Sequence, residues 1–115
     1  MSPNDKPLVW LSGEVKTPPF SARARLLCGY LLRQLQKGAP VVMPDSRPMP
    51  SIGSGCHELR ITDGPVQWRL IYRIDPDAIV IADVFQKKTQ KTPKKNLDVC
   101  RTRFARYDAA TQGER

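Results

Sequence analysis

The sequence predicts an α+β domain in which a small antiparallel (mixed) β-sheet packs against helices, in the order β-α-β-β-β-α. Three short apolar segments between residues 56 and 86 are separated by tight turn sequences, which is typical of neighbouring antiparallel strands. Two further segments, one before and one after them, repeat apolar residues at helical spacing. The length of 115 residues is typical of a single domain.

The N-terminal third is predicted to form one strand and one helix. An apolar run at about residues 8–12 has the length of a short strand, and the proline-containing segment 17–19 is expected to be a connector. A helix is predicted over about residues 21–37, with Ser21 as its N-cap and Gly38 as its C-terminal stop. Its apolar stripe consists of Phe20, Ala24, Leu27, Leu31 and Leu35, with Tyr30 beside them.

The middle of the chain is predicted to form a long connection and then a three-stranded meander. Residues 39–55 contain four prolines and are expected to be irregular. Loops of this length are often functional, and a plain spacer is the equal alternative. Strands are predicted at about 56–62, 66–74 and 78–86, because Asp-Gly-Pro and Asp-Pro-Asp turns separate them.

The last predicted element is a helix over about residues 93–107. Thr92 is expected to cap it and Pro93 to occupy the first helical position. Its apolar face consists of Leu97, Cys100, Phe104 and Tyr107. The domain is therefore expected to span residues 1–115, with polar tails at about 1–6 and 108–115.

Strand alternation divides the predicted sheet into two faces. If Thr62 pairs with Gln67 across the first turn, Arg60 lies opposite Arg69. One face then carries charged side chains, namely Glu58, Arg60, Arg69 and Arg73. The other is mostly apolar and carries His57, Leu59, Ile61, Trp68, Leu70 and Tyr72. A shift of the register by one residue would exchange the two faces.

Positive charge is concentrated where the last strand meets the last helix. Residues 86–106 hold eight Lys/Arg and one Asp, and so carry +7 of the formal net charge of +8. Lys91, Lys94 and Lys95 surround the start of the helix, whose free N–H groups and dipole also attract anions. We expect these three lysines to bind a polyanion, and nucleic acid is the commonest one.

The paired arginines extend this predicted phosphate-binding surface. Two arginines side by side repel each other unless an anion lies between them, and Lys87 and Lys88 add charge at one end of the same sheet. A guanidinium can hold two phosphate oxygens at once, which favours Arg60, Arg69 and Arg73 as ligands. The alternative is a surface lattice of salt bridges around Glu58.

Composition argues against several other classes of protein. The apolar runs are too short to cross a bilayer, and the N-terminus lacks the pattern of a secretory signal, so a cytoplasmic location without membrane contact is expected. The three cysteines are widely spaced and odd in number, which fits free thiols in a reducing compartment. Cys56-His57 is the one neighbouring Cys/His pair and does not make a zinc site, so no metal or cofactor is expected.

Three blocks of sequence resemble a known family. They are residues 56–61 (CHELRI), residues 68–72 (WRLIY) and residues 83–93 (DVFQKKTQKTP). In this order they are similar to the phage-derived, HigB-like branch of the RelE/ParE toxin superfamily. The pattern of that branch is approximately HELR, then a strand with Arg and Tyr three apart, then F-x-KK-T-x-K-T-P. The resemblance covers about residues 7–107, and the last block is the most specific.

This resemblance implies a RelE-like fold and a type II toxin that a cognate antitoxin, usually a helix-turn-helix protein, binds and silences. It also implies an endoribonuclease (mRNA interferase) that cuts mRNA on the ribosome without a metal and inhibits translation. Two alternatives remain open, because a fold does not decide an activity. One is a ParE-like toxin that inhibits gyrase, and the other is a non-catalytic nucleic-acid-binding phage protein.

RNA cleavage by the ribose 2′-oxygen needs a proton acceptor, a proton donor and positive charge near the phosphate. We expect Arg60 and Arg69 to hold the phosphate, and Lys87 and Lys88 to stabilise added charge, one of them also moving a proton. Tyr72 is expected to orient the 2′-hydroxyl or to stack on a base. Arg73 is expected to bind RNA.

Several of these residues also have structural readings. Tyr72 shares its predicted face with Trp68 and Leu70, which favours a role in packing. His57, the one histidine, lies on the same face and is expected to be a satisfied core or edge residue. Glu58 is either a general base or, as we favour, the residue that orients Arg60.

Overall fold

The computed structural model describes residues 4–11, 20–88 and 91–112. The elements in these ranges are β1 (Leu8–Trp10), α1 (Ala22–Gln36), β2 (Ser46–Pro48), β3 (Cys56–Asp63), β4 (Val66–Ile74), β5 (Ile79–Lys87) and α2 (Lys94–Thr111). The predicted α+β class is confirmed, with one strand more than expected. The end of the first predicted strand at residue 12, the connector at 17–19 and the outermost residues of both tails lie outside the described residues.

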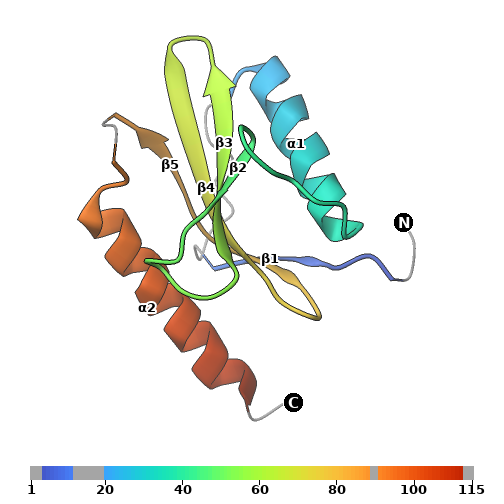
Figure 1. Ribbon diagram of the computed structural model, residues 1–115, viewed down its shortest axis with the longest axis vertical. Coiled ribbons are helices and arrows are strands. Elements are labelled where there is room, and N and C mark those ends of the chain that lie inside the picture. Colours follow the sequence, from blue (N-terminus) through green and yellow to red (C-terminus); the bar gives the residue numbers. More distant parts are fainter. Residues whose placement is uncertain (1–3, 12–19, 89–90, 113–115) are drawn as a thin grey trace.

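The five strands form one mixed sheet in the order β1-β5-β4-β3-β2 (Figure 1). β1 pairs with β5 in parallel, and the other neighbours are antiparallel. The predicted register is confirmed, because Arg60 lies opposite Arg69 and Thr62 opposite Gln67. Gly64, with φ of 60°, supplies the left-handed residue of the turn between β3 and β4.

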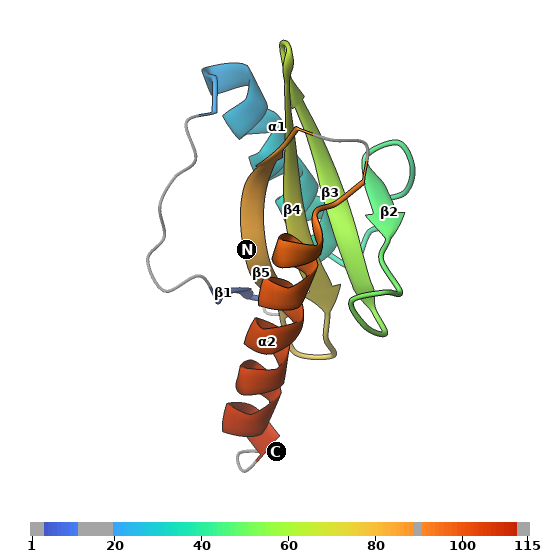
Figure 2. The same cartoon turned by 90° about the vertical axis from the view of Figure 1, so that its left-hand side faces the viewer.

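The two helices lie on opposite sides of this sheet (Figures 1 and 2). The core on the α1 side combines the inner face of α1 with one face of the sheet. Its largest contributors from the sheet are Leu59, Ile61, Trp68, Leu70, Tyr72, Ile79 and Ile81. This is the face that strand alternation predicted to be apolar.

The boundaries of α1 follow the predicted signals, but its apolar stripe is rotated. Ser21 caps the helix by accepting a hydrogen bond from the Ala24 backbone N–H at 3.1 Å. The buried residues are Ala24, Cys28, Leu31, Leu32 and Leu35. Leu27 was predicted to be in the stripe, yet it remains 36% exposed, and its neighbour Leu26 is 76% exposed. The α1 helix therefore carries apolar side chains on its outer side as well.

The charged face of the sheet carries a second core, which the sequence analysis did not predict. α2 packs across this face and buries Cys100 and Phe104 against residues such as Ile71 and Val80. The rest of the predicted α2 stripe, Leu97 and Tyr107, packs against the same core. In Figure 2 α2 covers only one end of the face, so the other end is left for charged side chains.

The long connection between α1 and β3 contains the unpredicted strand β2. Ser46–Pro48 pairs with β3 and forms the edge of the sheet. Ser46 is buried, and its hydroxyl lies 2.5 Å from the Tyr72 hydroxyl. This hydrogen bond and the backbone pairing hold a proline-flanked segment in place, so the connection is not a plain spacer.

α2 departs from prediction at both ends. Thr92 does not cap it, because its hydroxyl donates to Glu58 instead, and Pro93 occupies the N-cap position without a side-chain hydrogen bond. At the other end the helix continues to Thr111, although a tail was expected from residue 108. Asp108, which was assigned to that tail, forms an ion pair with Arg73.

The three cysteines are free and buried, as the sequence analysis expected. Burial raises the pKa of the Cys28 thiol to about 11 and that of the Cys100 thiol to about 12. In the described part of the chain no helix is long and apolar enough to span a membrane.

Candidate functional site

A buried carboxylate connects the three sequence blocks of residues 56–61, 68–72 and 83–93. Glu58 on β3 is only 1% exposed. Its Oε2 accepts a hydrogen bond of 2.7 Å from the Thr92 hydroxyl, just before α2. Its Oε1 lies 3.1 Å from Nε of Arg69 on β4. Glu58 therefore fixes both the neighbouring strand and the segment that leads into α2.

The contact between Glu58 and Arg69 is an ion pair without hydrogen-bond alignment. Glu58 Oε1 and Arg69 Nε are both buried, and neither has a hydrogen-bond partner in the described residues despite their short separation. The Arg69 guanidinium donates instead to the Trp68 backbone carbonyl at 2.9 Å. Burial lowers the pKa of Arg69, and the carboxylate of Glu58 opposes this effect by raising it.

Besides Arg73 at its other end, the sheet face of Glu58 carries four basic side chains, which we call the cationic cluster: Arg47, Arg60, Arg69 and Lys87. Residues opposite each other on paired strands point to the same face. Arg47 of β2 lies opposite Glu58, and Arg60 of β3 lies opposite Arg69. Lys87 of β5 lies opposite Gln67, two residues along β4 from Arg69.

The members of the cationic cluster act on one another electrostatically. The pKa of Lys87 is lowered, first by burial and then by the positive charges of Arg69, Arg60 and Arg47, while the carboxylate of Glu58 raises it. Four cations facing one carboxylate leave an excess of positive charge. An anion bound at this place would relieve that excess, and a lysine with a lowered pKa can exchange a proton more easily near neutral pH.

Exposure separates a fixed inner part of the cationic cluster from an accessible outer part. Arg69 is only 4% exposed, so it is not the open phosphate ligand that the sequence analysis expected. Arg60 and Lys87 are partly exposed, and Arg47 is exposed. An incoming phosphate would therefore meet Arg47, Arg60 and Lys87, with Arg69 as fixed positive charge behind them.

The exposed lysines lie around this cluster. Lys88 follows the end of β5, and Lys91, Lys94 and Lys95 lie at the start of α2. The hydrogen bond from Thr92 to Glu58 brings the start of α2 to the cluster. The first N–H groups of a helix lack intrahelical partners and attract anions, so this helix end adds to the positive potential.

The predicted site residue Tyr72 is not part of this arrangement, and His57 lies outside it too, as expected. Tyr72 is fully buried on the opposite face, within the α1 core, and burial raises the pKa of its hydroxyl. It is therefore a packing residue that also holds β2 through Ser46. His57 also lies on that face, stacked on Tyr72 with ring centroids 5.3 Å apart, and Nδ1 lies 3.1 Å from the Gly55 carbonyl oxygen.

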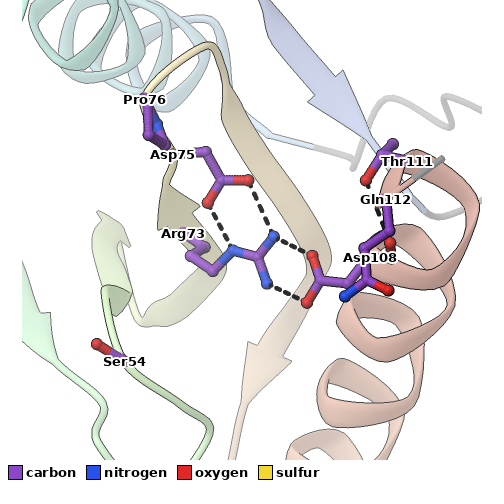
Figure 3. Close-up of a pocket in the computed structure, with 7 residues that line it drawn as sticks. All are labelled: Ser54, Arg73, Asp75, Pro76, Asp108, Thr111 and Gln112. Atoms are coloured by element: carbon purple, nitrogen blue, oxygen red, sulfur yellow. Dashed lines mark hydrogen bonds and ion pairs between the residues drawn. The ribbon is translucent and has the colours of Figure 1, made fainter. Parts of the chain in front are cut away.

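Arg73, predicted to bind RNA, is instead held between two carboxylates at the other end of the face (Figure 3). Its guanidinium donates to both carboxylate oxygens of Asp75 and to both of Asp108, at 2.7–3.0 Å. It also lies over the Phe104 ring, 4.9 Å from the centroid. A cavity of about 360 Å³ adjoins these residues, but they belong to the support of α2 rather than to the cationic cluster.

Arg47 and the partner of Thr92 were not predicted from the sequence. Arg47 was placed in an irregular connection, although a residue before proline favours extended backbone and this was a signal for a strand. Thr92 was assigned to a cap because it precedes Pro93, and only the folded chain reveals the carboxylate within its reach. No group of three or more His, Cys, Asp or Glu residues suited to a metal ion occurs within residues 4–11, 20–88 and 91–112.

Comparison with protein-family models gives a match to the family described as phage-derived protein Gp49-like (DUF891), over residues 19–105. This range includes α1, all strands except β1 and most of α2, and so it contains the whole cationic cluster. No curated protein and no solved structure matches the chain significantly.

Proposed function

The chain belongs to the phage-derived Gp49-like family, a toxin-like family of toxin–antitoxin systems, and we propose that it is a type II toxin that cleaves mRNA. In this proposal it is an mRNA interferase that acts on ribosome-bound transcripts, needs no metal and is silenced by a cognate antitoxin. The helix-turn-helix class proposed for that antitoxin follows from the resemblance described above.

One observation carries the proposal: cations from three strands gather around a buried carboxylate beside the start of a helix. Arg47, Arg60 and Lys87 come from β2, β3 and β5, and each is at least partly exposed. Arg69 is fixed behind them by Glu58. Positive charge fixed in advance stabilises a developing phosphorane without reorganisation during the reaction, so the arrangement suits phosphoryl transfer.

The proposed reaction is attack of the ribose 2′-oxygen on the adjacent phosphorus. The bond between the 2′-oxygen and phosphorus forms, and the bond between phosphorus and the 5′-oxygen breaks. Neutral Lys87 accepts the 2′-hydroxyl proton, and the resulting ammonium returns a proton to the leaving 5′-oxygen. Arg60 and Arg47 hold the phosphate oxygens. The products are a 2′,3′-cyclic phosphate and a 5′-hydroxyl.

The outer lysines position the transcript rather than take part in the chemistry. Lys88, Lys91, Lys94 and Lys95 are exposed around the cationic cluster and suit contacts with the RNA backbone. Among the described residues, Glu58 and the cationic cluster provide no accessible acid or base besides Lys87, because Glu58 is buried and occupied. We therefore expect isolated protein to cleave free RNA poorly and to depend on the ribosome for alignment.

Controlled expression in bacteria tests this proposal. Wild-type protein should arrest growth and translation, and mapped mRNA ends should carry 5′-hydroxyl groups in the presence of a chelator. Arg60→Ala and Lys87→Ala should lower cleavage at least 100-fold, since the first removes charge from the transition state and the second removes the group that transfers the proton. Arg106→Ala is the matched control, because Arg106 is exposed on α2 and should be neutral.

The same experiment separates the alternatives. DNA damage and filamentation without new mRNA ends would identify a gyrase inhibitor. Binding of nucleic acid without toxicity would identify a non-catalytic protein. Full toxicity of Lys87→Ala would contradict the assigned mechanism, even if the chain proved to be a toxin.

A further inference from the structure

The outer side of α1 carries apolar side chains that the described part of the fold leaves uncovered. Leu26 is 76% exposed, Tyr30 is 61% exposed and Leu27 is 36% exposed. Leu26 and Tyr30 are four residues apart and therefore lie one above the other on the same side of the helix. Single exposed apolar residues are ordinary, but a contiguous patch of this kind is typical of a contact surface.

A glycine within this surface points to a close approach by another molecule. Gly29 lies in the middle of α1, next to Tyr30, and does not have a positive φ. A Cβ added to it would meet no atom of residues 4–11, 20–88 and 91–112 within 4 Å. Glycine weakens a helix interior, so the described part of the fold offers no reason for its presence here. A partner backbone packed against this place would supply one.

The charge around the patch identifies the kind of partner. Residues 22–37 contain four basic residues, Arg23, Arg25, Arg33 and Lys37, and no acidic residue. Arg33 is already paired with Asp5 at 2.7 Å, so the positive charge offered to a partner comes from the other three. A second copy of this chain would bring like charges together, whereas an acidic partner would be complementary. Beside the patch is a groove of about 480 Å³, lined by Ser21, Arg23, Ala24, Leu27, Thr62, Asp63 and Gly64. Asp63 is already engaged there by the Ser21 backbone N–H at 2.9 Å.

We propose that the α1 surface, defined as Leu26, Leu27, Gly29 and Tyr30, is the docking site for an acidic amphipathic helix of the antitoxin. The identity of the partner rests on the proposed function. The location of the docking site rests on the exposed apolar side chains of α1, the basic residues around them and Gly29. An amphipathic helix places its apolar side chains at intervals of three and four residues, which matches the spacing on α1. Its acidic side chains then face the arginines at the edges.

This surface lies on the opposite side of the sheet from the cationic cluster (Figure 2). A helix docked on α1 therefore holds the antitoxin without contacting Lys87. It follows that variants of the α1 surface change the affinity for the antitoxin but leave the toxicity of the free protein unchanged.

The test measures binding to one defined probe, the protein encoded by the reading frame adjacent to that of this chain. Full-length chain carrying Lys87→Ala is titrated with it in a calorimeter, which avoids toxicity during production. Leu26→Glu and Gly29→Leu should each weaken binding at least 10-fold. Val42→Glu is the matched control and should bind normally, because Val42 is 67% exposed but lies outside α1.

Gly29→Ala provides the sharpest readout. It should raise the melting temperature of the free chain, because alanine favours a helix, and yet weaken binding of the probe. Unchanged affinity for Leu26→Glu and Gly29→Leu, with melting temperatures near wild type, would overturn the proposal. So would a wild-type dimer that Leu26→Glu dissociates, or a loss of affinity only for anionic vesicles or RNA.

Failure of this inference is distinguishable from failure of the proposed function. If expression of the wild-type chain alone does not arrest growth, the toxin assignment fails, whatever the α1 variants do. If the chain is toxic and the adjacent protein neutralises Leu26→Glu as well as wild type, only the docking site fails.

Discussion

Glu58 is the residue on which the candidate site depends. With 1% exposure it contacts Arg69 on one oxygen and Thr92 on the other, so one carboxylate joins three separate parts of the sequence. The sequence analysis favoured a role for Glu58 in orienting Arg60, but the ion pair is with Arg69. A buried carboxylate compensates the charge of a buried guanidinium, which neither residue could achieve alone.

Removal of this carboxylate should therefore be costly. Glu58→Ala leaves Arg69 buried without its counter-charge, and we expect a loss of about 3–5 kcal/mol in the free energy of unfolding. Chemical denaturation measures it. Asp98→Ala is the control, because Asp98 pairs with Arg101 at the surface and should cost less than about 1 kcal/mol. Equal losses of stability in the two variants would contradict the role of Glu58 as the counter-charge of buried Arg69.

Lys87 gives the proposed reaction its pH dependence. Burial and neighbouring cations lower its pKa below 10.5, so the neutral amine that accepts a proton forms at a lower pH than in a free lysine. Single-turnover cleavage should rise as pH increases through this lowered pKa and then level off. Lys87→Arg keeps the positive charge, but its guanidinium cannot lose a proton. The variant should therefore bind RNA, and its cleavage rate should not rise with pH. A wild-type profile that falls with increasing pH would exclude the base role.

At the scale of elements, α2 is attached to the sheet near both of its ends. The Thr92–Glu58 hydrogen bond holds the segment before its first turn, and the ion pair of Asp108 with Arg73, which Asp75 also binds, holds its last turn. Phe104 and Cys100 pack between these attachments. The helix start is thereby held beside the cationic cluster, so the distant Arg73 supports the site through α2.

Replacement of Arg73 should loosen the C-terminal half of α2. Arg73→Met keeps an apolar stem against Phe104 but removes the ion pairs of Arg73 with Asp75 and Asp108. We expect a loss of about 3 kcal/mol in the free energy of unfolding and faster amide exchange in the last two turns of α2. Arg106→Met is the control on the same helix. If Arg73→Met instead weakened RNA binding at unchanged stability, the original assignment of Arg73 as an RNA ligand would be restored.

At the scale of the whole molecule, the two sides of the sheet serve different proposed purposes. One side carries the cationic cluster and the start of α2, and the other carries α1 with its uncovered apolar surface. The formal net charge of +8 belongs mainly to residues 86–106, and α2, which contains most of that range, lies on the first of these sides. An anionic transcript and an acidic antitoxin helix can therefore contact different surfaces of one small domain.

The salt dependence of RNA binding should report the number of contacts between the protein and RNA phosphates. For single strands the slope of log affinity against log salt is about −0.7 for each phosphate contact. Arg60→Ala should make the slope shallower by about one contact, or about 0.7, while Arg106→Ala should leave it unchanged. Fluorescence titrations over a range of salt concentrations measure it. Equal slopes for Arg60→Ala and wild type would place the bound RNA away from the cationic cluster.

Much of the fold was predictable because it depends on local patterns. The three central strands lie within one residue of their predicted positions, and the pairing of Arg60 with Arg69 follows from strand alternation and a short turn. β2 was missed, because three residues flanked by prolines carry almost no periodic signal. Its position depends on Ser46 reaching Tyr72, a contact between distant parts of the sequence.

The candidate site was predicted in its composition but not in its geometry. Arg60 and Arg69 were assigned correctly to one face, Lys87 was expected at one end of the same sheet, and the lysines near residue 93 were expected at a helix start. Tyr72 and Arg73 were also chosen because their residue types suit RNA. The fold instead buries Tyr72 under α1 and pairs Arg73 with the carboxylates of Asp75 and Asp108.

The amino-acid sequence by itself determined the class of fold, the register of β3 with β4 and the excess of positive charge, because these properties depend on neighbouring residues and simple periods. Only the tertiary structure decided which cations remain accessible. The burial of a side chain and its interaction partners depend on which distant segments pack together. Glu58, for example, forms an ion pair with Arg69 and accepts a hydrogen bond from Thr92. A charge pattern read along the chain contains no information on which carboxylate will neutralise which arginine.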